Sequence, residues 1–69
     1  MTYEEKFNIA EQLEKQGIEI FELIELHSAV LMGDQDKVNS DFFYLLKDIE
    51  NIGITPKNLK QVINFLYKF

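Results

Sequence analysis

Residues 18–32 read IEIFELIELHSAVLM, and this stretch decides the fold class. It is the most apolar part of the chain, yet Glu19, Glu22 and Glu25 recur at every third position. A helix places residues three apart along one side, whereas a strand would divide them between its two faces. The spacing therefore predicts a helix over 18–32 that ends at Gly33 and carries its three carboxylates on one side.

The other sides of this helix are expected to contact neighbours. The residues opposite the carboxylates are predicted to face the core: Ile20, Leu23, Ile24, His27, Val30 and Leu31. Three further apolar residues are predicted to form a second contact surface: Leu26, Ala29 and Met32. We therefore expect this helix to be the central element of the fold and to touch neighbours on more than one side.

The N-terminal segment predicts another helix. Thr2-Tyr3-Glu4-Glu5 is a capping-box pattern, in which the Thr2 hydroxyl accepts a hydrogen bond from the N–H of Glu5. Apolar residues then recur at helical spacing: Tyr3, Phe7, Ile9, Ala10 and Leu13. Gly17 supplies the left-handed residue that commonly ends a helix. The pattern predicts a helix over about 3–16.

The third predicted helix has two candidate starting points. Apolar residues keep one helical phase up to Gly53: Val38, Phe42, Leu45, Leu46, Ile49 and Ile52. The helix begins either at Asp34 or at Asn39, where Asn39 would act as the cap with a Val38–Phe43 hydrophobic staple. The two alternatives change the length of the preceding loop but not the fold.

The last segment predicts a fourth helix. Thr55 followed by Pro56 is a strong start signal, because proline has no N–H to lose at the first helical position. A helix over about 56–68 would bury four aliphatic residues: Leu59, Val62, Ile63 and Leu66. Together the patterns predict an all-α fold, a small bundle of four short helices that forms one domain over residues 1–69. A chain of this length buries only about 60% of its unfolded surface, too little for two cores.

Composition argues against catalysis and against a membrane span. The chain has no cysteine and a single histidine, His27, which lies by phase on an apolar helix side. Metal sites and nucleophilic catalysis need several converging groups, so we expect no enzyme, metal, cofactor or small-molecule substrate. No stretch approaches the roughly 20 apolar residues of a span, and the start MTYEEKF is not a signal peptide. A cytoplasmic protein is expected, and the Phe, Tyr, Asn, Ile and Lys bias suggests an AT-rich bacterial or phage genome.

Charge is distributed unevenly along the chain. Residues 1–36 carry nine acidic residues against Lys6 and Lys15, while residues 55–69 carry three lysines and no acid. The row of Glu19, Glu22 and Glu25, extended by two carboxylates of the preceding helix, is a candidate docking surface for a basic partner protein. Those two carboxylates belong to Glu11 and Glu14.

The chain closes on three aromatic residues, Phe65, Tyr67 and Phe69, that lie on different sides of the last predicted helix. One core face cannot bury all three, and aromatic residues are frequent anchors of protein interfaces. They are therefore candidate protein-binding residues. A homodimer is a further expectation, because the apolar content is generous for a chain this short.

Residues 49–62 resemble the helix-turn-helix of small bacterial and phage repressors. Ile49, Gly53, Ile54, Leu59 and Val62 occupy the apolar and glycine positions of that pattern. The resemblance implies a DNA-binding regulator that uses residues 49–68, with the last helix as the recognition helix. Its outward residues would contact nucleic acid: Lys57, Asn58, Lys60, Gln61, Asn64 and Lys68.

Three observations count against DNA binding. The chain has no arginine, the commonest reader of guanine; Ile49 is larger than the residue usual at its position; and the remainder of the chain is strongly acidic. The favoured hypothesis is therefore a small, non-enzymatic regulatory module that binds a partner protein through its acidic helices or its aromatic end. A phage or mobile element would be a natural source of such a module. The alternative is the DNA-binding regulator.

Overall fold

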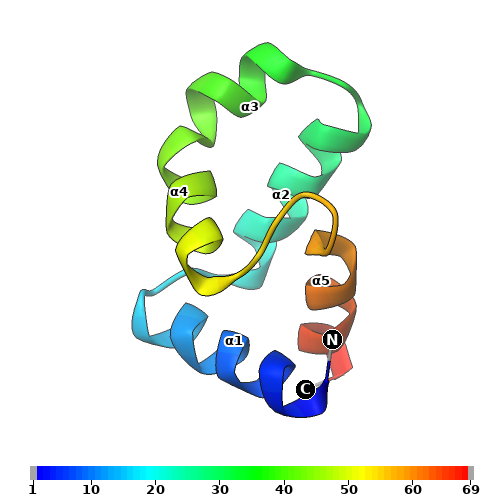
Figure 1. Cartoon of the computed structure of the whole chain (residues 1–69). Helices are drawn as coiled ribbons and strands as arrows, with labels where there is room; N and C mark the ends of the chain where they lie inside the picture. The colour runs from blue at the N-terminus through cyan, green and yellow to red at the C-terminus, as the bar shows by residue number, and fades with distance from the viewer. Residues whose placement is uncertain (1, 69) are drawn as a thin grey trace.

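The computed structural model describes residues 2–68, and this part of the chain contains five helices and no strand (Figure 1). The helices are α1 (Tyr3–Lys15), α2 (Ile20–Leu31), α3 (Gln35–Asp41), α4 (Phe43–Ile52) and α5 (Leu59–Lys68). The prediction of an all-α fold is confirmed. The predicted number of helices, four, is wrong by one, because the third predicted helix is divided in two.

Helix α1 begins and ends as its sequence predicts. The Thr2 hydroxyl oxygen accepts a hydrogen bond from the backbone N–H of Glu5 at 3.2 Å. At the other end Gly17 has a φ of +72°, and the N–H groups of Gly17 and Ile18 donate to the carbonyls of Glu14 and Leu13. This pair of bonds is the Schellman motif, which needs a left-handed residue at the position of Gly17. The chain therefore turns sharply between α1 and α2.

The third predicted helix is interrupted at Phe42, which has the non-helical angles φ −114° and ψ 15°. Of the two candidate starts, Asp34 is confirmed, since its side chain accepts from the N–H of Lys37 at 3.2 Å. Asn39 is not a cap, because it lies inside α3 and accepts a hydrogen bond from Gln35. The Ser40 hydroxyl donates to the carbonyl of Asp36, a bond that tends to bend helices.

Because of the interruption at Phe42, residues 35–52 can pack against two different helices. Helix α3 packs against α2, whereas α4 packs against α1, and one straight helix would not meet both. Phe42 itself is buried at the junction. The apolar phase therefore continues through the break, and for this reason the periodicity of the sequence does not reveal it.

The start of the last helix is three residues later than predicted. Helix α5 begins at Leu59, and residues 56–58 form a turn in front of it. Asn58, not Thr55, holds this turn together. Its side-chain oxygen accepts from the N–H of Thr55 at 2.8 Å, and its side-chain nitrogen donates to the carbonyl of Gly53 at 3.0 Å.

Helix α2 is the central element, as predicted. It packs against α3 on one side and α5 on the other, while α1 crosses the end of the bundle and contacts α4 and α5 (Figure 1). Twelve residues from all five helices and the last connection form one core: Ile9, Leu13, Leu23, Leu26, Ala29, Val38, Phe42, Ile49, Ile54, Leu59, Val62 and Ile63. Among the described residues, no polar or charged side chain is buried.

The predicted core side of α2 is rotated from the observed one. Leu26 and Ala29 are buried, although the sequence assigned them to a secondary surface, while Leu31 is 73% exposed. Ile20, Ile24, His27 and Val30 are partly buried. The cause is the position of α2 between two neighbours, which centres burial on Leu23 and Leu26. Within residues 2–68, no helix combines the length and apolar character that crossing a membrane requires.

Candidate functional site

The most promising site is an apolar groove beside α1, with a volume of about 600 Å³. Its walls come from α1, the turn after it, the start of α2 and the end of α5. Six apolar residues line it: Phe7, Ala10, Leu13, Ile18, Ile20 and Leu66. Three exposed carboxylates also line it, those of Glu11, Glu14 and Glu19. We call this feature the acid-rimmed groove.

Local sequence explains why the groove is open and acidic. On α1, Leu13 points into the core, and Ala10, Glu11 and Glu14 follow on the flank beside it. Ala10 has only a methyl group and Gly17 has no side chain, so neither fills the space. The sharp turn at Gly17 then brings Glu19 to the same place. Glu19 is the N-cap of α2 but makes no side-chain capping hydrogen bond.

The five carboxylates proposed from the sequence do not form one surface. Glu11, Glu14 and Glu19 line the acid-rimmed groove, but Glu22 is partly buried on α2 and is not among its lining residues. Glu25 lines a different hollow of about 350 Å³, shared with Lys37. The fold thus gathers Glu11 and Glu14, which extend the predicted row, with only one member of the row itself, Glu19.

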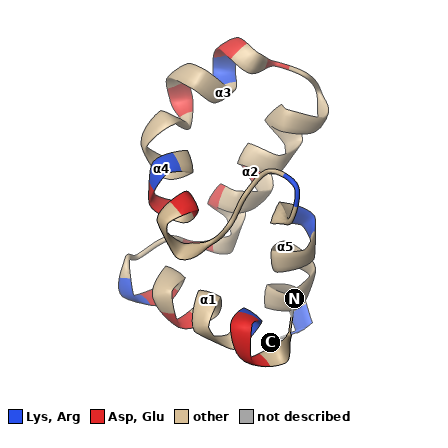
Figure 2. Ribbon diagram, in the orientation of Figure 1, with Lys and Arg blue, Asp and Glu red and all other residues tan. Residues whose placement is uncertain are grey.

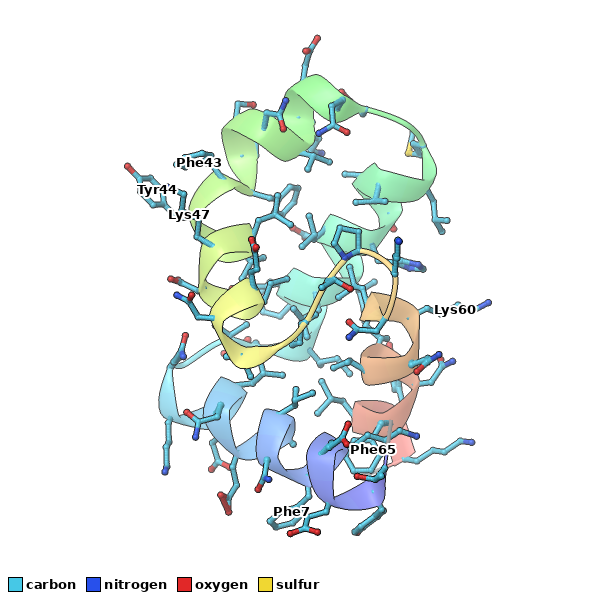
Figure 3. The ribbon with its side chains drawn as sticks, in the orientation of Figure 1. Phe7, Phe43, Tyr44, Lys47, Lys60 and Phe65 are labelled. Atoms are coloured by element: carbon cyan, nitrogen blue, oxygen red, sulfur yellow. The ribbon has the colours of Figure 1, made fainter. Side chains whose placement is uncertain are left out.

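The aromatic end of the chain is divided between packing and exposure. The Phe65 ring (Figure 3) is partly buried. It lies edge-to-face on Tyr3, with 5.7 Å between ring centroids, and the Lys6 ammonium lies 5.7 Å from the Phe65 centroid. These contacts join the start of α1 to the end of α5. Tyr67 is 70% exposed. Phe69 lies outside the described residues.

The residues proposed to contact nucleic acid are also dispersed. Gln61, Asn64 and Lys68 line a shallow hollow of about 230 Å³ together with Lys6. Lys57 and Lys60 are exposed on the connection and on α5, which carry no acid, whereas carboxylates lie on the other four helices (Figure 2). The Asn58 side chain bonds to its own connection. Only half of the predicted set therefore shares a hollow.

The helix-turn-helix resemblance extends to burial but not to the turn. Ile49, Ile54, Leu59 and Val62 are all buried, and Gly53 has a φ of +100°. However, α4 and α5 are joined by six residues, 53–58, where a helix-turn-helix has about three or four. In the described part of the chain, α4 packs against α1 and α3, whereas α5 packs against α1 and α2, and the backbones of α4 and α5 do not pack side by side.

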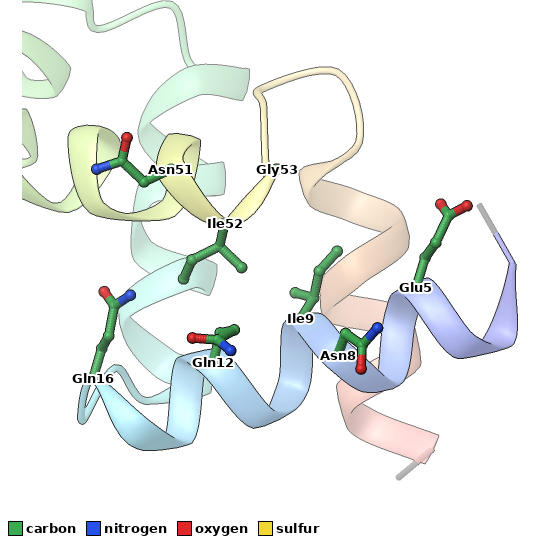
Figure 4. A pocket seen from close by; sticks show the side chains of 8 residues that line it. All are labelled: Glu5, Asn8, Ile9, Gln12, Gln16, Asn51, Ile52 and Gly53. Carbon is green, nitrogen blue, oxygen red and sulfur yellow. The ribbon is translucent and has the colours of Figure 1, made fainter.

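Two surfaces were not anticipated from the sequence. Four carboxamides surround a cleft of about 400 Å³ between α1 and the end of α4: Asn8, Gln12, Gln16 and Asn51 (Figure 4). The four-residue spacing of the first three is a signal that was available. On the outer side of α4, the Phe43 and Tyr44 rings are 5.4 Å apart, and the Lys47 ammonium lies 4.4 Å from the Phe43 centroid (Figure 3).

Reactive groups are sparse among residues 2–68. His27 is partly buried on α2, and no set of three histidine or carboxylate side chains in this range is placed to hold a metal ion. No protein-family model, curated protein or solved structure matches the chain. The function of this protein is therefore inferred from the geometry of its surfaces.

Proposed function

We propose that this protein is a small regulatory module that binds a basic surface of a partner protein at its acid-rimmed groove. The observation that carries the proposal is the combination of an apolar groove with the carboxylates of Glu11, Glu14 and Glu19. Apolar surface released from water supplies affinity, and complementary charge supplies orientation and a faster encounter. A module of this kind works by covering a site and needs no reactive residue.

The groove has the size and composition of a binding site. Its volume of about 600 Å³ lies within the range of about 300 to 1,000 Å³ that is usual for ligand sites. Partly exposed Ile18, Ile20 and Leu66 leave apolar surface in water that a partner would cover. The carboxylates beside them would select a partner with lysine or arginine.

The same features count against the DNA-binding alternative. A duplex is repelled by the carboxylates of α1 and α2, because phosphate attraction supplies most nonspecific affinity. The six-residue connection is longer than a helix-turn-helix turn, and the Asn58 side chain is already hydrogen-bonded within it. Protein binding therefore has more support than DNA binding.

The test compares three forms of the tagged protein in cells that naturally produce it. These are the wild type, a groove variant and a control variant with the same loss of charge. The groove variant is Glu11→Gln, Glu14→Gln and Glu19→Gln. The control variant is Glu4→Gln, Glu25→Gln and Glu50→Gln, three exposed residues outside the groove, of which Glu4 lies near a helix start as Glu19 does.

We expect one protein to be captured by the wild type and the control variant but not by the groove variant. The purified pair should then bind directly, and more weakly as salt rises, because dissolved ions screen the attraction between exposed charges, with a screening length of about 10 Å at 0.1 M salt. Capture of the same proteins by all three forms would overturn the proposal. Tight binding of a labelled DNA duplex at low salt would favour the alternative.

A further inference from the structure

We infer that the partner segment that occupies the acid-rimmed groove is an amphipathic α-helix, with an apolar stripe flanked by lysine or arginine. This inference rests on the proposed function and specifies the secondary structure and side-chain pattern of the bound segment. It follows from three observations. These are the lack of a strand beside the groove, the chemistry of the side chains that line it, and the lack of a matching helix elsewhere in residues 2–68.

The groove offers an extended occupant no strand with which to pair along its length. Residues 2–68 contain no strand, so there is no sheet edge to which an extended segment can add. At the turn, the N–H groups of Gly17 and Ile18 already donate to Glu14 and Leu13, and the carbonyl of Glu19 accepts from Glu22. An extended segment would bury its own peptide groups against apolar side chains without partners, which is costly. A helix avoids this cost because it satisfies its backbone internally.

The side chains that line the groove indicate which side chains a complementary occupant must carry. Carboxylates only accept hydrogen bonds, so their partners must be donors, and lysine and arginine also match their charge. Glu11 and Glu14 are three residues apart on α1, which places them one turn apart along the groove. Basic residues three or four apart on a docked helix match that spacing. The small Ala10 side chain, which lies one turn before Glu14 on α1, leaves space in the groove for an apolar anchor.

A second copy of this chain is a poor occupant. Among the helices of residues 2–68, only α5 carries lysines and no acid, but its Leu59, Val62 and Ile63 are already buried in the core. The exposed Phe43 and Tyr44 of α4 are followed on the same helix by Asp48 and Glu50. No described helix therefore presents an apolar stripe with basic flanks, and the occupant is a different protein.

The experiment uses three labelled synthetic peptides and fluorescence anisotropy at low salt. The first peptide is an amphipathic helix with leucine and phenylalanine on one side and lysine on both flanks. The second has the same composition in an order that gives no apolar side when helical. The third is the first with every lysine replaced by glutamate. The second peptide controls for attraction between any basic peptide and an acidic protein.

We expect the first peptide to bind with an affinity at least about tenfold above the second, because only a continuous apolar stripe fills the groove. The third should not bind. The groove variant should weaken the first peptide by about tenfold, through three lost charge pairs, while the control variant changes it less than about twofold. A separate Ala10→Phe variant should also weaken binding by filling the groove, with circular dichroism to check its fold.

Backbone amide NMR locates the peptide. Shifts should gather at Ala10, Ile18, Glu19 and Leu66, and the free peptide should gain helix on binding. Equal binding of the first two peptides, no binding of either, or shifts confined to α4 would overturn this inference. The proposed function would still stand if the groove variant loses its cellular partner, so the two failures are distinguishable.

Discussion

Helix α5 takes part in two apolar regions that differ in one respect. On the side facing α2, Leu59 and Val62 belong to the same core as Leu23 and Leu26 of that helix, and all four are almost completely buried. Four residues beyond Val62, Leu66 lines the acid-rimmed groove, where apolar side chains stay partly exposed beside three carboxylates. The side chains are chemically alike in both regions. Only the interior is closed by other helices.

This difference separates stability from binding. Apolar surface contributes to folding when the chain itself covers it, and to association when a partner must cover it. Substitutions in the interior should therefore lower the free energy of unfolding, while substitutions at the carboxylates of the groove should leave it nearly unchanged.

The largest effect is expected inside the bundle. Leu26→Ala should lower the free energy of unfolding by about 2 to 5 kcal/mol, because it leaves a cavity where a fully buried side chain was. Met32→Ala, at the end of the same helix, is the matched control. Met32 is 82% exposed, so its truncation should cost less than about 0.5 kcal/mol. Urea unfolding followed by circular dichroism measures both.

A similar loss in the free energy of unfolding for both variants would contradict the assignment of Leu26 to the interior and of Met32 to the exposed surface. It would mean that the end of α2 is covered, for example by self-association. Light scattering at several concentrations distinguishes this outcome, because a homodimer doubles the mass in solution.

A smaller effect is expected where the connection before α5 closes over the interior. Asn58→Ala removes two hydrogen bonds, to Gly53 and Thr55, and should cost about 1 to 2 kcal/mol. Asn64→Ala, at an exposed position on α5, should cost nothing measurable. The same urea experiment compares them. Equal stability of the two variants would show that Asn58 is not the residue that holds the connection.

The cap of α1 should contribute less again. Thr2→Ala should lower stability by about 1 kcal/mol, since it leaves the N–H of Glu5 without its acceptor. Thr2→Asp keeps an acceptor at this position and should retain most of the stability. Thermal unfolding of the three proteins measures the difference. A loss in Thr2→Asp as large as in Thr2→Ala would show that the hydroxyl acts by other means.

Periodicity and capping were enough to predict much of this fold. Local patterns within a single helix and its flanking residues are enough to predict the ends of α1, the cap at Asp34 and the central position of α2. The break at Phe42 and the late start of α5 depend on which neighbours each segment meets and on a side chain bonding across its own loop. Leu26 was assigned to a secondary surface for the same reason, because burial on α2 is set by α5 and α3 together.

The candidate site was predicted only in part. The sequence indicated an acidic docking surface, but helical phase on α2 placed its centre at Glu19, Glu22 and Glu25. The structure gathers Glu11, Glu14 and Glu19, because the turn at Gly17 determines how α1 and α2 are oriented to each other. The periodicity of a single helix does not contain this orientation. The groove between the two helices depends on α5, which is distant in sequence, so its apolar lining could not be anticipated.

The smallest effect on stability, and the sharpest separation, is expected at the edge of the groove. Glu11→Gln with Glu14→Gln should change the free energy of unfolding by less than about 0.5 kcal/mol, because both side chains are exposed. The two contributions should nearly cancel, because the variant removes the repulsion between Glu11 and Glu14 and also the attraction between Glu11 and Lys15, and each is worth about 0.2 to 0.5 kcal/mol. Binding of the amphipathic basic peptide should nevertheless fall several-fold in anisotropy titrations at low salt, and the difference from wild type should vanish at high salt. A loss of stability that parallels the loss of binding would mean that these carboxylates hold the bundle together, and the separation between interior and groove would fail.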